Sequence, residues 1–86
     1  MKVLYTNQHK AFVALIKRER KAANLLQTEL AQRCNKSQQW VSGIELGQRR
    51  ISVADFIELA MAIGFCPVTA INQIAEIKND ELGIAR

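Results

Sequence analysis

The sequence predicts an all-α fold, a compact bundle of five helices, and three observations lead to this prediction. Apolar residues recur at the three- and four-residue spacing of amphipathic helices along most of the chain. The segments between them are short and hold Asn, Ser, Gly and Pro, the residues that begin and end helices. The 86 residues are 49% hydrophobic and include one Pro and four Gly, as expected for one folded domain with a small core.

Residues 1–6 come before the first helix. They are predicted to form a short strand or an ordered arm, because the apolar run 3–5 favours extended backbone. Asn7 is the expected N-cap of a helix that runs to about Ala23, and Asn24 closes it in the left-handed conformation. The apolar face of this helix consists of Phe12, Leu15, Ile16 and Ala23, and its solvated basic face of Lys17, Arg18 and Lys21.

The second and third helices are short and are separated by a tight turn. The second begins near Gln27 and ends around Asn35, a residue that tolerates left-handed backbone. Ser37 is the expected N-cap of the third helix, and Gly47 ends it. The residues expected to point inward from these two helices are Leu30, Ala31, Val41 and Ile44.

The last two helices are strongly apolar. Ser52, with Asp55 three residues later, approximates a capping box for the fourth helix, which Gly64 ends. Pro67 is placed to open the fifth helix at its first position. The expected core residues are Val53, Phe56, Ile57, Leu59, Ala60 and Ile63 in the fourth helix and Val68, Ile71, Ile74, Ala75 and Ile77 in the fifth.

Two adjacent glutamines, Gln38 and Gln39, open the third helix. A glutamine amide carries a donor and an acceptor together, so it can form a bidentate pair with adenine in the DNA major groove. A helix whose N-terminal residues lie on base edges is the geometry of helix-turn-helix proteins. These two side chains are therefore candidate base readers, although glutamines in isolation are more often simply solvated.

Positive charge is concentrated in the part of the chain that carries these glutamines. Residues 1–50 hold ten basic and three acidic side chains, a net charge of +7, whereas residues 51–86 hold two basic and five acidic ones, a net charge of −3. The total is +4. This distribution favours a polyanionic partner, although many small soluble domains are mildly basic.

Several classes of function find no support in the sequence. Cys34 and Cys66 form no CxxC motif and the one histidine, His9, lies far from both, so no metal or cofactor site is expected and both thiols are interpreted as reduced and mostly buried. No catalytic set and no glycine-rich phosphate loop is present, so an enzyme is not expected. The chain has no run long enough to span a bilayer and no signal peptide, which favours the cytoplasm.

Spaced features of the middle of the chain resemble the lambda-repressor-like helix-turn-helix family, which includes phage repressors, Cro proteins and Xre-type regulators. They are the pattern Gln27-x-x-Leu30-Ala31, the run Ser37-x-x-x-Val41-Ser42-x-Ile44-Glu45-x-Gly47, and an apolar fourth helix ending in Gly64. Trp40 and the pair Arg49-Arg50 are similar to a common bacterial subgroup. The resemblance covers roughly residues 10–66 and implies a domain at 7–66 that binds DNA.

The resemblance also implies roles for individual residues. Arg20 and Glu45 are expected to form a structural ion pair between the first and third helices, because a guanidinium can bond a carboxylate bidentately. Base contacts are implied for Gln38, Gln39, Ser42 and Gly43. Phosphate contacts are implied for Gln27, Lys36, Ser37, Trp40, Arg49 and Arg50.

Three positions qualify these roles. Gly43 and Leu46 stand where relatives usually carry long polar or basic residues, so each removes an expected contact, although Gly43 also allows close approach to the DNA. Trp40 has two interpretations, a packing residue resting on the second helix or an apolar contact with the DNA. Cys34 stands where relatives usually have Leu, so it is expected to fill the core.

The function expected from these features is sequence-specific binding to double-stranded operator DNA by a transcriptional regulator, most simply a repressor acting as a homodimer. Residues 67–86, the fifth helix and tail, are expected to provide the dimer contact through Ile71, Ile74 and Ile77, or else to close the domain's own core. The alternative is an antitoxin or adaptor of the same fold whose main partner is another protein, such as a toxin.

Overall fold

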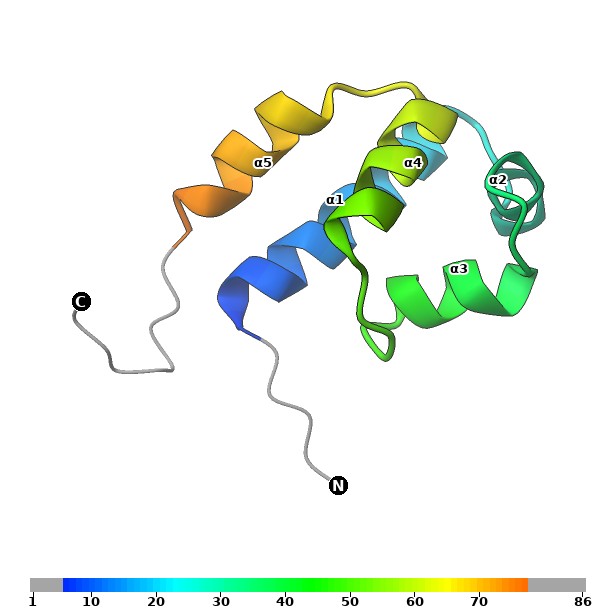
Figure 1. The fold of residues 1–86 in the computed structure, drawn as a ribbon, viewed down its shortest axis with the longest axis horizontal. Helices are drawn as coiled ribbons and strands as arrows, with labels where there is room; N and C mark the ends of the chain where they lie inside the picture. The colour runs from blue at the N-terminus through cyan, green and yellow to red at the C-terminus, as the bar shows by residue number, and fades with distance from the viewer. Residues whose placement is uncertain (1–5, 78–86) are drawn as a thin grey trace.

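The computed structural model describes residues 6–77, which form five helices and no strand. In chain order these are α1 (Asn7–Ala22), α2 (Gln27–Arg33), α3 (Gln38–Glu45), α4 (Val53–Ile63) and α5 (Pro67–Ala75) (Figure 1). The prediction of an all-α fold is thereby confirmed. The strand or arm predicted before the first helix lies outside the described residues, apart from Thr6.

A serine or threonine hydroxyl caps the N-terminus of three of the helices. The Ser37 and Ser52 hydroxyls accept from the backbone N–H of Trp40 and Asp55, at 3.1 and 3.0 Å, as their N-cap prediction requires. The N-cap of α1 was predicted one residue too late. Thr6, with extended backbone, accepts from the N–H of His9 at 3.1 Å, so Asn7 is already the first helical residue.

Residues with left-handed backbone end the helices at the predicted positions. Asn24 and Asn35 have φ of 59° and 58°, and Gly47 and Gly64 have φ of 77° and 106°. Asparagine and glycine adopt this conformation at the lowest cost, because the first can bond locally and the second has no Cβ. The connections between helices are therefore short, and they turn the chain sharply.

The core forms where α1 and α4 pack against each other and against the neighbouring helices. In Figure 1, α2 and α3 lie together at one end of the molecule and α5 at the other. The largest of the fully buried side chains are Ile16, Leu30, Cys34, Val41, Ile44 and Leu59. Burying each of the larger ones contributes about 1.5–3 kcal/mol. None of the described helices is long and apolar enough to span a membrane.

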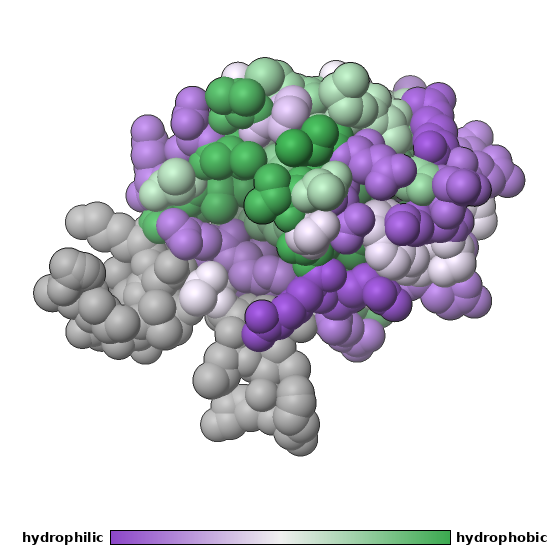
Figure 2. Space-filling model, viewed as in Figure 1, coloured by the Kyte–Doolittle hydropathy of each residue, from purple (hydrophilic) through white to green (hydrophobic). Residues whose placement is uncertain are grey.

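Fewer apolar residues of α4 and α5 are buried in the core than the sequence predicted. Phe56, Leu59, Ala60 and Ile63 of α4 are buried, but Val53 and Ile57, predicted as core, are 70% and 44% exposed. In α5 the small Ala70 is buried, and the predicted Val68 and Ile71 are 65% and 44% exposed. In Figure 2, hydrophobic surface gathers over the part of the molecule that α4 and α5 form. Ala23 and Ala75, also predicted to point inward, are exposed.

Only one of the two thiols is buried, in contrast to the prediction that both would be. Cys34 fills the core as expected, and burial raises the pKa of its thiol. Cys66 is exposed at the N-cap of α5, where hydrogen bonding from the Thr69 side chain and from backbone N–H groups lowers the pKa of the thiol. Since the thiolate is the reactive species, the two cysteines should differ strongly in reactivity.

Treatment of the native protein with iodoacetamide near neutral pH is expected to alkylate Cys66 and to spare Cys34. Mass spectrometry should show one added group in native buffer and two in denaturant, and Cys66→Ser should reduce these numbers to none and one. Rapid alkylation of Cys34 in native buffer would contradict the packing of the core described above.

Candidate nucleic-acid interface

The polar face of α3 carries the residues predicted to read bases. The helix buries Trp40, Val41, Ile44 and Glu45, and this leaves Gln38, Gln39, Ser42 and Gly43 on the opposite side. Residues at these spacings share one face of an α-helix. Gln39 is exposed, and the other three are partly exposed. The structure therefore brings all four residues together on one surface.

A buried ion pair connects this helix to α1. The Arg20 Nε and Nη2 atoms donate to the two carboxylate oxygens of Glu45, at 2.6 and 3.0 Å. The third nitrogen of the guanidinium, Nη1, donates to the backbone carbonyl of Leu25 at 2.7 Å. The side chains of Arg20 and Glu45 are only 9% and 3% exposed. The pair thus links α1, the connection before α2, and the end of α3.

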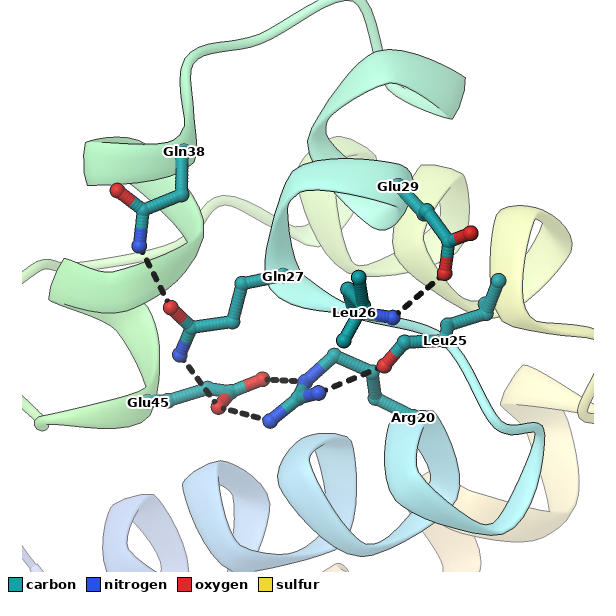
Figure 3. A network of polar contacts seen from close by, with 7 residues as sticks. All are labelled: Arg20, Leu25, Leu26, Gln27, Glu29, Gln38 and Glu45. Carbon is teal, nitrogen blue, oxygen red and sulfur yellow. Dashed lines mark hydrogen bonds and ion pairs between the residues drawn. The ribbon is translucent and has the colours of Figure 1, made fainter.

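Two glutamine amides extend this pair to the surface (Figure 3). Gln27 Nε2 donates to Glu45 Oε1 at 3.0 Å, and Gln38 Nε2 donates to Gln27 Oε1 at 2.7 Å. An ionised carboxylate only accepts hydrogen bonds, so the NH₂ group of Gln27 must face Glu45 and its oxygen must face Gln38. The charge of one buried residue therefore determines the orientation of both amides.

The orientation leaves Gln38 with the groups that base recognition needs. One of its two N–H donors is directed at Gln27, which leaves a second N–H and the carbonyl oxygen of the same amide. A phosphate contact was expected for Gln27. The structure instead engages both ends of the Gln27 amide within the chain, so that Gln27 supports Gln38.

Two contributions to this region escaped the sequence analysis. Glu29 accepts from the backbone N–H of Leu26 at 2.8 Å and so caps the start of α2, and the Leu25 carbonyl completes the hydrogen bonding of Arg20. The spacing of Glu29 three residues after the N-cap is the signal that could have revealed the first. No local sequence pattern predicts the contact between Arg20 and the Leu25 carbonyl, because it depends on the position of α1.

Trp40 and Lys36 lie at the start of α3. Trp40 is only 9% exposed and belongs to the core cluster, which favours the packing interpretation of this residue. The Lys36 Nζ atom lies 5.3 Å from the centre of the indole ring, within range of a cation–π interaction. The Ser37 hydroxyl, expected at a phosphate, accepts the capping hydrogen bond from Trp40.

Arg49 and Arg50 lie exposed in the connection between α3 and α4. The side chain of Arg49 crosses Gly43: a Cβ atom built on this glycine would lie 3.6 Å from Arg49 Cβ and 3.7 Å from Arg49 Nε. The ion pairs of residues 6–77 join Arg18 to Glu19 and Arg20 to Glu45. Neither pair involves Arg49, Arg50 or Lys36, so no ion pair of the described residues neutralises these cations, which lie before and after α3 in the chain.

The arrangement is suited to binding. Within residues 6–77, no three His, Cys, Asp or Glu side chains come together in a way that could hold a metal ion. What the surface presents is a row of amide and hydroxyl groups flanked by cations. The amide and hydroxyl groups can form hydrogen bonds with base edges, and the cations can contact phosphates.

Comparison with known proteins gives matches over most of the chain. A family model described as helix-turn-helix matches residues 16–71. An XRE-family-like protein from Pseudomonas syringae has a similar structure, with a TM-score of 0.76 and 31% identity over 79% of this chain and 83% of that one. No curated protein sequence is similar enough to count as a match.

Two restriction-modification controller proteins are also similar in structure. C.AhdI from Aeromonas hydrophila has a TM-score of 0.64 and 30% identity over 69% of this chain and 86% of that one. C.Esp1396I, solved as a tetramer in complex with its natural 35 base-pair operator, has a TM-score of 0.74 and covers 84% of this chain and 95% of its own. At 18% identity, this likeness shows a common fold alone.

Glu45→Ala is expected to destabilise the protein strongly, because it leaves the Arg20 guanidinium buried without its carboxylate. Removing one partner of a buried pair costs roughly 3–5 kcal/mol, which for a domain of this size lowers the melting temperature by more than about 10 °C. Thermal unfolding followed by circular dichroism measures this. The control Glu58→Ala, at an exposed position of α4, should change the melting temperature little; equal effects of the two substitutions would contradict the structural role of the pair.

Proposed function

Because this chain belongs to the lambda-repressor-like helix-turn-helix family, we propose that it is a transcriptional regulator that binds double-stranded operator DNA and reads a half-site with α3. The observation that carries the proposal is the oriented amide of Gln38. A hydrogen-bonded chain from a buried carboxylate fixes this side chain before DNA arrives. Fixing it in advance reduces the conformational entropy lost on binding.

Gln38 has the groups to recognise adenine. Its second N–H matches the N7 acceptor of adenine, and its carbonyl oxygen matches the N6 donor. Gln39 and Ser42 extend the polar face, and Gly43 adds no side chain to it. The expected half-site therefore contains at least one adenine whose identity matters for affinity.

Phosphate contacts set the affinity and its dependence on salt. We assign them to the basic and polar groups around α3, in particular Lys36 and Ser37 at its start and Arg50 beyond its end. Trp40 contributes chiefly by packing, since its ring is largely buried and supports the Lys36 side chain.

We propose further that the protein acts as a homodimer. The apolar side chains that α4 and α5 expose, Val53, Ile57, Met61, Val68 and Ile71, form a surface that a second copy would cover. Two copies related by a two-fold axis place their α3 helices on half-sites about 34–36 Å apart. Occupying an operator in this way is sufficient for repression.

The alternative, an antitoxin or adaptor, would use the same apolar surface for a different protein. The exposed stripe of α4, which lies beside the face of α5 expected to form the dimer, is the observation that favours it. A chain that binds DNA but stays monomeric would support this alternative.

Gln38→Ala and Gln39→Ala are expected to reduce sequence preference without loss of folding. Each should lower affinity for the preferred site by about 1–3 kcal/mol, roughly 5- to 150-fold, and should leave binding to unrelated DNA nearly unchanged. Fluorescence anisotropy at two salt concentrations measures both. Gln32→Ala, on the exposed side of α2, is the matched control. If neither substitution changes the ratio of preferred to unrelated DNA, α3 is not the reading helix.

Ile71→Glu is expected to convert the dimer to a monomer and to weaken operator binding, because it places a charge in an apolar contact. Sedimentation velocity at concentrations from about 1 to 100 µM measures the change. Gln32→Glu adds the same charge on α2 and should remain dimeric. A wild-type protein that is monomeric throughout this range would eliminate the homodimer.

A further inference from the structure

We propose that Arg49 is a base-reading residue that determines specificity for a guanine, in place of the phosphate contact expected for it. The proposal rests on the proposed function, since it requires α3 to enter the major groove. It concerns a different element, the connection that follows α3, and a contact made by an arginine.

The first step of the argument is the position of Gly43. It lies four residues after Gln39, so it occupies the same face of α3 one turn further along. A residue with a side chain here would project beside those of Gln39 and Ser42. Glycine leaves that place open.

The second step is the geometry of the chain after α3. The Gly47 N–H donates to the Ile44 carbonyl at 3.0 Å and the Gln48 N–H donates to the Gly43 carbonyl at 2.9 Å, the two bonds of a Schellman motif. With Gly47 in the left-handed conformation, the motif turns the backbone back along the helix. Arg49, which follows Gln48, therefore lies beside Gly43.

The third step is the path of the Arg49 side chain. Both its Cβ and its Nε atoms lie within ordinary van der Waals distance of the place where a Gly43 Cβ would be, at 3.6 and 3.7 Å. The aliphatic part of the Arg49 side chain therefore lies along the face of α3 that carries Gly43. Its Nε atom, the first nitrogen of the guanidinium, lies at the surface of that helix. Arg49 supplies the long polar group that position 43 lacks.

The neighbouring arginine is placed differently. Of the two arginines, Arg49 is the one with atoms within 4 Å of the Gly43 Cβ position. The charge of Arg50 contributes, after burial, to lowering the pKa of His9, so Arg50 lies within electrostatic range of the start of α1. Arg50 is the better candidate for a phosphate.

Chemistry identifies the base. A guanidinium has two parallel N–H donors that match the O6 and N7 acceptors of guanine, and a lysine ammonium does not reproduce this fork. The half-site should therefore contain a guanine that Arg49 recognises, separate from the adenine assigned to Gln38.

The test is selection of bound sequences from random double-stranded DNA by the 86-residue chain and by four variants: Arg49→Ala, Arg49→Lys, Arg50→Ala and Arg50→Lys. Both arginines are exposed, and circular dichroism verifies that every variant folds. We expect Arg49→Ala and Arg49→Lys to reduce the preference for guanine at one position by about tenfold or more, with the other positions unchanged. Arg50→Ala should lower affinity for all sequences evenly and reduce the salt dependence.

Two results would overturn the proposal, and they are distinguishable. If the wild-type chain selects no motif at all, the proposed function fails and the role of Arg49 fails with it. If the wild type selects a motif and neither Arg49 variant changes the preference at any position, the proposed function stands and Arg49 is a phosphate contact. Loss of guanine preference in Arg49→Lys, which keeps the charge, supports base reading specifically.

Discussion

The ion pair between Arg20 and Glu45 is the interaction on which the rest of the reading surface depends. Two charges buried this deeply are tolerated because each nitrogen of the guanidinium donates a hydrogen bond and both carboxylate oxygens accept one. The same requirement imposes a direction on the surrounding polar groups. Since the carboxylate can only accept, Gln27 has one allowed amide orientation, and Gln38 inherits it. A feature of the core thereby determines which atoms the molecule presents to a partner.

The small size of the core has a consequence at the opposite end of the molecule. Helices α4 and α5 are apolar around much of their circumference, but the domain offers only one face for each to pack against. Val53, Ile57 and Met61 of α4 consequently remain outside. The apolar stripe and the polar face of α3 are two regions of different chemistry, the first suited to a protein partner and the second to a polyanion.

The features that the sequence predicted best are those that depend on the local conformation of the backbone. The caps at Ser37 and Ser52 and the left-handed turn at Asn35 follow from the conformations that single residues prefer. The sequence predicted less well what depends on packing. A helix that is apolar all round does not reveal its inner face, so Val53 and Val68 were placed in the core wrongly. The amide chain joins residues 11 and 18 positions apart, and no periodicity encodes such a contact.

Position 43 shows how local and long-range requirements combine at the end of α3. Glycine within a helix costs about 1 kcal/mol relative to alanine, and a methyl group here would meet Arg49 only at ordinary contact distance. An alanine at position 43 would therefore fit without a steric clash. A longer side chain, however, would compete with Arg49 for the same surface. The proposed reading face thus has a buried carboxylate behind its first residue and, beside Gly43, the arginine that the turn after α3 brings back.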